Sequence, residues 1–543
     1  MSSRSADRSP SHTSSAVQLV LPMPATPPPR RRESVTDDTA AQTPDAALAL
    51  SLLHSMSGRS AEAVATVDKV LSQSALPAEM RARGVCSRLL AGLLAGDVEA
   101  SRRLAEEILA GDRRSDDDTT LGGALTALGL VAWERGRAED ALGLLGAAVR
   151  RMGRTCACLR FLRPELELAD KYVALGDLHE ADAIISRADW EINATGDGAW
   201  SAATMLARAR LDLATGDLRR ALRQALVAQD LAREMGARVF VTDARWVCAA
   251  VAVRRGDLAE AEGYVAWWRS APTATTRRDR GAWILLEACL AVARGGPTAV
   301  TQVLADVHRC PQAHRGLLLT HPGATALLVR TALAVADRDT AEAVSACARQ
   351  LAGDNPSVPV IGAAADHADG LLRGSVDLLV KAARGYRDPW ARGSAYEDAG
   401  IVASDDNDDS RARAMLGSAL SAYRQSGAIR DVRRVNAALR ALRTTRRARR
   451  ATRPVSGWAS LTAAERRVAD VVAEGVTNGE AADRLFVSRH TVDFHLRQIF
   501  RKLGISSRVE LARMVGERSD DPPDRVASHH RRPERARLGL EGV

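Results

Sequence analysis

The sequence predicts an all-α protein in which a long solenoid of helical hairpins is followed by a compact domain of four short helices. Hydrophobic residues make up 46% of the chain but aromatic residues only 3%. The apolar content is mostly Ala, Leu and Val, which favours helices over strands. A glycine motif recurs about every 40 residues through most of the chain. Three pairs of helix-capping residues follow near its C-terminal end.

The chain has 543 residues, more than a single hydrophobic core usually supports, so several units or a repeat array are required. Composition and periodicity divide it into five segments. We expect a disordered leader at 1–45, a helical-repeat solenoid at 46–442, a basic linker at 443–457, a four-helix domain at 458–516 and a disordered tail at 517–543.

The repeat is marked by a Gly followed five residues later by a small or apolar residue. A Gly between two apolar helical stretches ends the first helix in a left-handed conformation, and the small residue lets the second helix pack closely. Clear copies, spaced 38 or 40 residues apart, begin at Gly58, Gly96, Gly136, Gly176, Gly216 and Gly256. Fainter copies are expected at Gly295, at Arg338 in place of the Gly, at Gly374 and near Asp409.

This spacing resembles a tetratricopeptide repeat, although the period exceeds the ~34 residues usual for that family. Such a solenoid presents an extended concave surface that suits peptides, proteins or small ligands. We therefore expect the repeat segment to receive an unknown peptide, protein or small-molecule input. The nine Trp residues of the chain are interpreted as core residues rather than as a ligand cage.

Two arginine-rich stretches flank the predicted solenoid. The leader carries PPPRRR at 27–32, which could touch nucleic acid or a membrane, although a solvated tail is the favoured interpretation. The linker reads RTTRRARRATR at 443–453 and breaks the apolar periodicity before Pro454. It either neutralises phosphates beside the last domain or serves as a soluble hinge.

Several classes of function are disfavoured. The seven Cys lie mostly in apolar helical stretches, as free thiols do in a reducing cytoplasm. Cys156 and Cys158 lack a second pair at zinc spacing, so we expect no metal site. No run of 18 apolar residues is present, so no membrane span is expected. No HExxH, GxSxG or GxxxxGK[ST] pattern occurs, so we expect neither an enzyme nor a bound cofactor.

The net charge of +9 is concentrated in one short segment. Residues 443–515 hold 15 Lys and Arg against 7 Asp and Glu, whereas residues 516–543 hold six of each. The remaining 442 residues therefore contribute only +1. A local basic surplus on an almost neutral body is typical of a module that binds a polyanion such as DNA.

Capping residues divide the segment from Leu461 to Val515 into four helices. Thr462 with Glu465 opens the first, which Gly475 stops, and Thr477 with Glu480 opens a second that runs through Leu485. Ser488 caps the third, which ends at Leu503 and Gly504, and Ser507 with Glu510 opens the fourth. Two short helices joined by a tight turn form a helix-turn-helix, whose second helix can lie in the major groove.

The third helix has an apolar face that is predicted to pack inward, formed by Val492, His495, Leu496, Ile499 and Leu503. On its outward face, Arg497 could donate to guanine, Asp493 could accept from cytosine N4, and Phe494 could meet a thymine methyl. The amides around Arg489 and His490 could hold a phosphate. A merely solvated helical face is an equal alternative on the charge pattern alone.

This segment resembles the LuxR-type helix-turn-helix domain along its whole length. The similar pieces are LTAAE at 461, EGVTNGEAADRLFVS at 474–488, TVDFHL at 491, RKLGISSR at 501–508 and the last helix. The resemblance implies that the third helix reads DNA and that the last helix pairs two subunits on an inverted repeat. Asp493 stands where many members have a basic residue, which argues against a phosphate contact there. The DNA-binding residues that we expect are Thr477, Asn478, Ser488, Arg489, His490, Thr491, Asp493, Phe494, Arg497, Arg501 and Lys502.

Residues 422–442 also resemble the end of the helical-repeat region in large ATP-binding LuxR regulators of actinobacteria, whose nucleotide-binding module has no counterpart motif here. We expect a cytoplasmic, nucleoid-associated regulator that binds double-stranded DNA as a homodimer. The resemblance suggests an activator, for which RNA polymerase is a possible partner. In the competing hypothesis the protein is an interaction scaffold whose helix-turn-helix serves only for pairing, but the local basic surplus argues against it.

Overall fold

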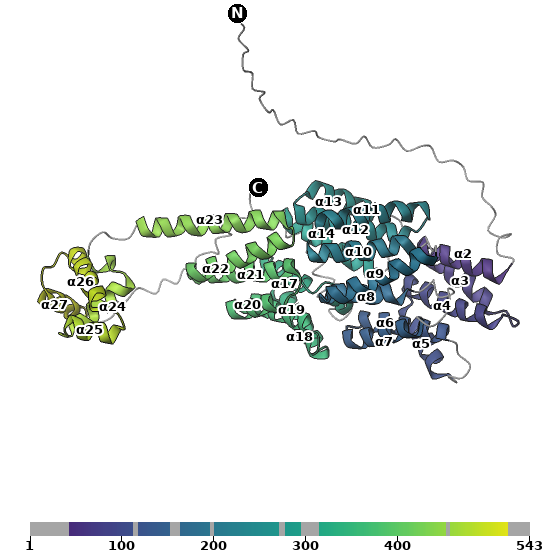
Figure 1. The fold of residues 1–543 in the computed structure, drawn as a ribbon, viewed down its shortest axis with the longest axis horizontal. Coiled ribbons are helices and arrows are strands. Elements are labelled where there is room, and N and C mark those ends of the chain that lie inside the picture. Colours follow the sequence, from purple (N-terminus) through teal and green to yellow (C-terminus); the bar gives the residue numbers. More distant parts are fainter. Residues whose placement is uncertain are drawn as a thin grey trace, which may run out of the picture.

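The structure is a computed structural model that describes residues 43–111, 118–152, 163–195, 200–270, 277–294, 314–451 and 457–519. Within these ranges the regular secondary structure is entirely helical, as the sequence predicted. Figure 1 shows a body of stacked helical hairpins, and a separate four-helix domain beyond the end of the long helix α23. Most of the predicted leader and most of the predicted tail lie outside the described residues, but helix α2 begins at Pro44, two residues inside the range predicted as leader.

The body is a succession of helices, most of which pack on their neighbours in sequence. Its N-terminal part consists of α2 (Pro44–Met56), α3 (Ser60–Leu71), α4 (Ala78–Ala95), α5 (Val98–Ala110), α6 (Asp118–Glu134), α7 (Ala138–Met152), α8 (Pro164–Leu175), α9 (Leu178–Thr195), α10 (Ser201–Thr215), α11 (Leu218–Glu234), α12 (Arg238–Arg255), α13 (Leu258–Ser270) and α14 (Arg277–Ala293). Its C-terminal part consists of α16 (Arg315–Thr320), α17 (Ala324–Ala334), α18 (Arg338–Asp354), α19 (Pro359–Arg373), α20 (Val376–Gly385), α21 (Pro389–Asp405), α22 (Asp409–Gln425) and α23 (Ile429–Ala451).

The glycine motif marks the turn inside each hairpin, as predicted. All six clear copies have a positive φ, between 80° at Gly58 and 93° at Gly216, which is the left-handed conformation that glycine adopts without steric cost. The Asp that follows the glycine caps the second helix in several hairpins, as Asp97 and Asp217 do for α5 and α11. The small residue five positions after each glycine is fully buried, at Ala63, Ser101, Ala141, Ala181, Ala221 and Ala261.

The fainter copies differ from the prediction in one place. The left-handed residue before α18 is Ala336, with φ 61°, rather than a residue at Arg338, and it stands five positions before the buried Ala341. Asn407, with φ 62°, has the same place before α22. The two copies were obscured in the sequence because a residue other than glycine accepts the strained turn. The predicted copy at Gly295 lies outside the described residues.

The C-terminal part of the body folds back on the N-terminal part, so that α16 packs against both α6 and α8. Asn355, buried after α18, joins the two parts: its Nδ2 donates to Gly136 O at 2.8 Å and its Oδ1 accepts from Ala138 N at 2.6 Å. Trp133 Nε1 donates to Thr320 Oγ1 at 2.9 Å. The turn of one hairpin thus serves as the docking point for helices about 200 residues further along the chain.

Gly216 provides a test of this packing. A Cβ at this residue would overlap the carbonyl oxygen of Gln425 and lie 2.7 Å from Ser426 Cα, whereas a Cβ at Gly96 would meet nothing within 4 Å. Alanine at Gly96 should cost only the ~1–2 kcal/mol of a left-handed alanine. We expect Gly216→Ala to cost at least about 1 kcal/mol more, because backbone must also move. If urea unfolding showed that the two variants lose the same free energy of unfolding, that result would contradict the contact between the N-terminal and C-terminal parts of the body.

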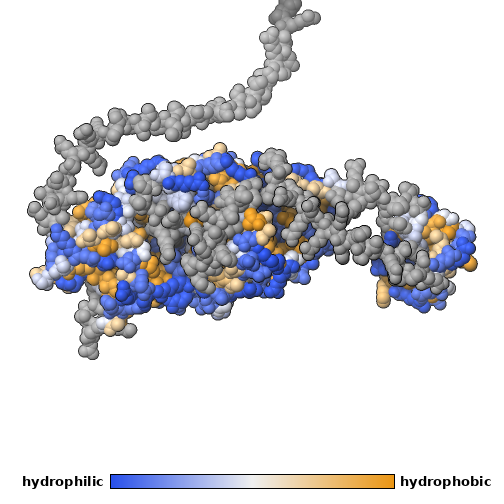
Figure 2. Space-filling model, turned by 180° about the vertical axis from the view of Figure 1, so that it is seen from behind, coloured by the Kyte–Doolittle hydropathy of each residue, from blue (hydrophilic) through white to orange (hydrophobic). Residues whose placement is uncertain are grey.

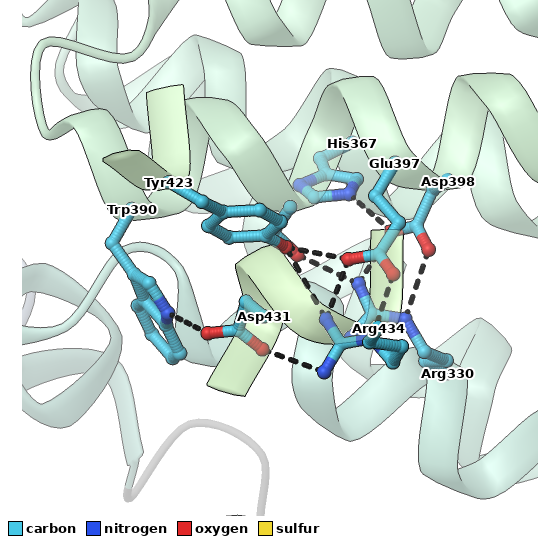
Figure 3. A network of polar contacts seen from close by, with 9 residues as sticks. Arg330, His367, Trp390, Glu397, Asp398, Tyr423, Asp431 and Arg434 are labelled. Atoms are coloured by element: carbon cyan, nitrogen blue, oxygen red, sulfur yellow. Dashed lines mark hydrogen bonds and ion pairs between the residues drawn. The ribbon is translucent and has the colours of Figure 1, made fainter. Parts of the chain in front are cut away.

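Helix α23, which leads toward the four-helix domain, is held by a group of polar residues that we call the α23 clamp: Trp390, Glu397, Tyr423, Asp431 and Arg434 (Figure 3). Trp390 Nε1 donates to Asp431 Oδ2 at 2.9 Å, and Arg434 donates to Asp431 Oδ1 at 2.6 Å. Arg434 Nε also donates to Glu397 Oε1 at 2.7 Å, while Tyr423 OH donates to Glu397 Oε2 at 2.6 Å. The start of α23 is thereby fixed to α21 and α22.

Beside the clamp lies a second polar group, the Asp398 triad of Arg330, His367 and Asp398. His367 Nε2 lies 2.8 Å from Asp398 Oδ2, and Arg330 Nε donates to Asp398 Oδ1 at 3.1 Å. Burial acts to raise the pKa of Asp398, but the charge of Arg330 and the hydrogen bond from His367 outweigh it and lower the pKa to about 2. Burial also lowers the pKa of His367, so a neutral imidazole and an ionised carboxylate meet here.

Helix α23 continues to Ala451 and so occupies part of the range that was predicted as a basic linker. Figure 2 shows a largely hydrophilic surface on the described residues of the body, with scattered apolar residues. Among the helices described, none is long and apolar enough to cross a bilayer. Cys86, Cys248 and Cys347 are buried and Cys289 is partly buried, and none of the four is in a disulfide. Cys156, Cys158 and Cys310 lie outside the described residues.

Candidate nucleic-acid interface

The C-terminal domain begins with a short 3-10 turn, η5 (Trp458–Ser460). Four helices follow: α24 (Ala463–Ala473), α25 (Asn478–Leu485), α26 (Arg489–Leu503) and α27 (Arg508–Ser519). Two predicted capping boxes are complete, Thr462 with Glu465 before α24 and Thr477 with Glu480 before α25. Ser488 caps α26 by accepting from Thr491 N at 3.1 Å, also as predicted.

The third predicted box, before α27, is wrong in one half. Ser507 Oγ accepts from Glu510 N at 3.2 Å, as a cap should. The carboxylate of Glu510, however, accepts from Ser506 N at 2.8 Å rather than from Ser507 N. The helix also runs on to Ser519, beyond the predicted boundary at 516. Helix α27 thus begins at Arg508, directly after the predicted cap Ser507, and only its end differs from the prediction.

The predicted inward face of α26 packs into the domain core. Val492, Leu496 and Ile499 are buried with Val468, Val472 and other apolar residues of α24 and α25. His495 and Leu503 are only partly buried. Gly475 and Gly504 have φ of 89° and 68° and end α24 and α26 where the sequence placed their ends. The core fixes the rotation of α26 and hence the face that it turns to solvent.

Lys502 does not lie on that outward face. Its Nζ donates to both carboxylate oxygens of Glu465, at 2.7 and 2.6 Å, and only 22% of its side chain is exposed. Burial acts to raise the pKa of Glu465, but the hydrogen bonds from Lys502 and Thr462 outweigh it and lower the pKa. Lys502 therefore ties α26 to α24, and its prediction as a DNA contact does not fit this geometry.

Asn478 and Asp493 also have partners within the domain. Asn478 Nδ2 donates to Asp493 Oδ1, and Asn478 Oδ1 accepts from Arg508 Nη2. These hydrogen bonds join α25, α26 and α27, and no spacing in the sequence indicated that Arg508 takes part in them. Thr477 is engaged in its capping box with Glu480, whose pKa is lowered by the hydrogen bond from Thr477 N. Thr477, Asn478 and Asp493 were predicted to bind DNA, and in the structure their side chains make hydrogen bonds within the domain.

The remaining predicted residues gather on one side of α26. Arg489, His490, Phe494 and Arg497 are exposed, and the aromatic side chain of Phe494 is 59% exposed. Arg501 is exposed as well and donates to Gln498 on its own helix. The first-turn amides of Arg489 and His490 precede the amide of Thr491 that Ser488 caps. The N-terminal half of α26 thus combines two guanidinium groups, an aromatic ring and the positive end of a helix dipole.

The model of the bacterial regulatory proteins of the luxR family matches residues 459–515. That range coincides with η5 and α24 to α27. This domain is a LuxR-type helix-turn-helix domain. Within the LuxR-type domain, α25 and α26 are the two helices of the motif, and residues 486–488 form the turn between them.

Curated relatives match this chain over short stretches. HTH-type transcriptional regulators of Mycobacterium bovis and Mycobacterium tuberculosis are 52% identical over 59 residues, which is 11% of this chain and 7% of each relative. The transcriptional regulatory protein SgaR of Hyphomicrobium methylovorum is 47% identical over 49 residues, 9% of this chain and 23% of that protein. A solved structure of a Rap protein complexed with competence and sporulation factor covers 74% of this chain and 98% of its own, at 11% identity and a TM-score of 0.37.

Phe486, in the turn of the LuxR-type domain, has a backbone conformation that is unusual for its residue type. Its φ is 55°, and its side chain is 96% exposed. A left-handed aromatic residue pays a steric cost of roughly 1–2 kcal/mol that glycine avoids, and this side chain recovers little by burial. We expect Phe486→Gly to raise the unfolding free energy of the domain by a net amount of about 1 kcal/mol. The relief of the steric cost is partly offset by the larger backbone entropy that glycine loses on folding. A lower melting temperature than the wild type would show that the ring has stabilising contacts.

Proposed function

We propose that the protein is a sequence-specific, DNA-binding transcriptional regulator in which α26 of the LuxR-type domain enters the major groove. The observation that carries the proposal is the exposed group of Arg489, His490, Phe494 and Arg497 on one side of a helix whose rotation is fixed by its buried face. Guanidinium groups suit guanine O6 and N7 or phosphate, and an aromatic ring suits a thymine methyl. The match to the luxR family, and relatives that are named as transcriptional regulators, support the same role.

The first amides of α26 are proposed to hold a phosphate while Arg497 reads a base. A helix N-terminus presents N–H groups and a partial positive charge, which favour an anion. Asp493 retains a second carboxylate oxygen beside the one that Asn478 binds, and that oxygen suits the amino group of cytosine N4. Ser488, Thr491 and Arg501 flank this contact area. Lys502 is left out of the proposed interface because of its pair with Glu465.

Replacing Arg497 tests this assignment. Arg497→Ala in the full chain should weaken binding to a cognate DNA by roughly 1–3 kcal/mol, or about fivefold to 150-fold, if the guanidinium contacts a base. Arg484→Ala is the matched control, because Arg484 is an exposed arginine on α25 that pairs with Glu474 at 2.6 Å. Fluorescence anisotropy with a labelled duplex measures both. Wild-type affinity in a folded Arg497→Ala protein would remove Arg497 from the readout.

We further propose that the protein is a homodimer on DNA, with α27 pairing two subunits across an inverted repeat. Val509 on the first turn of α27 is 80% exposed, and a two-fold pair would bury it. Activation of transcription, with RNA polymerase as a partner, is proposed from the family resemblance. The cytoplasm, where the DNA lies, is the proposed location. The repeat body is proposed to be the sensor or docking module of this regulator.

A further inference from the structure

We propose that the repeat body contains a binding site for a neutral, ring-bearing organic molecule. The site lies between α8, α10 and α12 on one side and α16 and the start of α21 on the other. This inference rests on the proposed role of the body as a sensor and gives that role a place and a ligand class. It is carried by the size of a cavity, by the aromatic rings on its wall and by the pairing of its charges.

The cavity has a volume of about 1600 Å³, whereas sites for drug-sized ligands measure roughly 300–1,000 Å³. Successive hairpins contribute equivalent residues to the cavity wall. Leu166, Leu206 and Trp246 lie 40 residues apart, on α8, α10 and α12, and all three line the cavity. The helices that line the cavity on this side are therefore the first helices of successive hairpins. A large ligand could contact several repeats at once.

Five of the nine Trp residues of the chain line the cavity: Trp133, Trp200, Trp246, Trp283 and Trp390. The Trp residues of the chain were predicted to be core residues, and Trp133 and Trp283 are indeed almost fully buried. The indole N–H of Trp246 donates to Ala282 O at 3.1 Å, and that of Trp390 donates to Asp431. Because these N–H groups already have acceptors, the two rings offer the ligand their apolar surfaces, which suit stacking against another ring.

On the side of the cavity formed by α8, α10 and α12, five charged groups pair with one another: Glu167, Asp170, Lys171, Arg210 and Asp243. Arg210 bridges Asp170 at 3.1 Å and Asp243 at 2.9 Å, so the three form a ladder across α8, α10 and α12. Lys171 pairs with Glu167 and with Asp170, both at 3.2 Å, and its ammonium lies 5.3 Å from the centre of the Trp133 ring. A charged ligand would have to compete with these partners, whereas a neutral one leaves the pairs intact.

The cavity reaches the α23 clamp through Trp390. This residue lines the cavity and binds Asp431 on the first turn of α23. Arg254 also lines the cavity, and its guanidinium lies 5.2 Å from the centre of the Trp390 ring. Figure 3 shows the Trp390 indole directed at Asp431. A ligand that stacks on Trp390 therefore contacts a residue that holds the helix leading to the LuxR-type domain.

The test uses the full chain and the neutral fluorescent amine 1-N-phenylnaphthylamine as the probe. We expect saturable binding to one site per chain. Ala214→Trp fills the cavity from α10, where Ala214 is partly exposed on the wall, and should weaken probe binding at least tenfold. Leu226→Trp is the matched control on α11, at an exposed position outside the cavity, and should leave the Kd within twofold. Ala203→Trp, on the same wall, replaces Ala214→Trp if that variant does not melt cooperatively.

Two outcomes would overturn the proposal: no saturable binding to the folded wild type, or an unchanged Kd in the cavity-filling variants. Hydrogen exchange of residues 429–434 measures the connection to α23 and should slow at least twofold when the probe is bound. Unchanged exchange would contradict that connection. DNA affinity measured on the same samples distinguishes failure of the cavity proposal from failure of the proposed DNA-binding function. Loss of probe binding with intact DNA binding refutes the cavity site alone. Absence of DNA binding with intact probe binding refutes the proposed function alone.

Discussion

Lys502→Ala is expected to destabilise the LuxR-type domain strongly and thereby weaken DNA binding. The substitution leaves the carboxylate of Glu465, which is 6% exposed, without its ammonium partner, and breaking a buried pair in this way costs about 3–5 kcal/mol. A domain of this size has on the order of 3–9 kcal/mol of total stability. Circular dichroism of the variant should show a domain transition at a lower temperature than in the wild type, together with weaker retardation of DNA.

The pair also gives the domain a pH dependence. The pKa of Glu465 in the folded state lies below its ordinary value of 4.5. Its contribution is therefore fully present above about pH 4.5 and is lost as the pH falls below that value. The domain transition of the wild type should weaken on acidification in this window, and Lys502→Ala should show a smaller change.

Arg501→Ala is the matched control for Lys502→Ala. Arg501 is the neighbouring cation on α26, is exposed, and bonds only its own helix among the described contacts. Its loss should change the unfolding free energy by no more than about 0.5 kcal/mol, while the salt slope of DNA binding falls by roughly one if it neutralises a phosphate. If Lys502→Ala instead melted like the wild type and merely weakened binding, Lys502 would be a DNA contact, as the sequence analysis expected.

Asp398→Ala is expected to destabilise the C-terminal part of the body by about 3–5 kcal/mol, which is typical when one partner is removed from a buried ionic group. The side chain of Asp398 is 6% exposed and accepts from Arg330 and His367, and His367 is 1% exposed. Its removal leaves His367 with only its contact to Tyr386, at 3.3 Å, among the described bonds. Urea unfolding followed by tryptophan fluorescence should show a lower midpoint.

Asp366→Ala measures the same substitution on the surface of α19. Asp366 pairs with Lys381 at 3.0 Å, but the lysine is 69% exposed, and such pairs contribute about 0–1 kcal/mol. We expect the midpoint to change little in this variant. Equal losses for Asp366→Ala and Asp398→Ala would mean that the Asp398 triad has no special part in holding α17, α19 and α21 together.

The features predicted well from the sequence are those that depend on residues close together in the chain. The boxes Thr462 with Glu465 and Thr477 with Glu480 and the cap at Ser488 involve neighbours three residues apart, so the pattern alone is sufficient. The glycine turns are local for the same reason. The turn at Ala336 was misplaced because a strained non-glycine residue has no sequence signal of its own.

Contacts across the fold could not be predicted. The pair of Lys502 with Glu465 spans 37 residues and the bond of Asn355 to Gly136 spans 219, and neither has a spacing that a periodic pattern would reveal. The face of α26 was predicted because the periodicity of Val492, Leu496 and Ile499 determines which side is buried. The pattern could not show which polar residues on the remaining faces bind one another, as Asn478 and Asp493 do.

Selection of binding sites from a randomised library of double-stranded DNA tests the central claim most directly, because it measures base preference rather than affinity alone. The full chain should converge on a short motif with two-fold symmetry, and Arg497→Ala should lose the preference at one base pair in each half-site while keeping the others. Failure of the folded wild type to enrich any motif, or an identical motif from Arg497→Ala, would contradict the reading of DNA by α26.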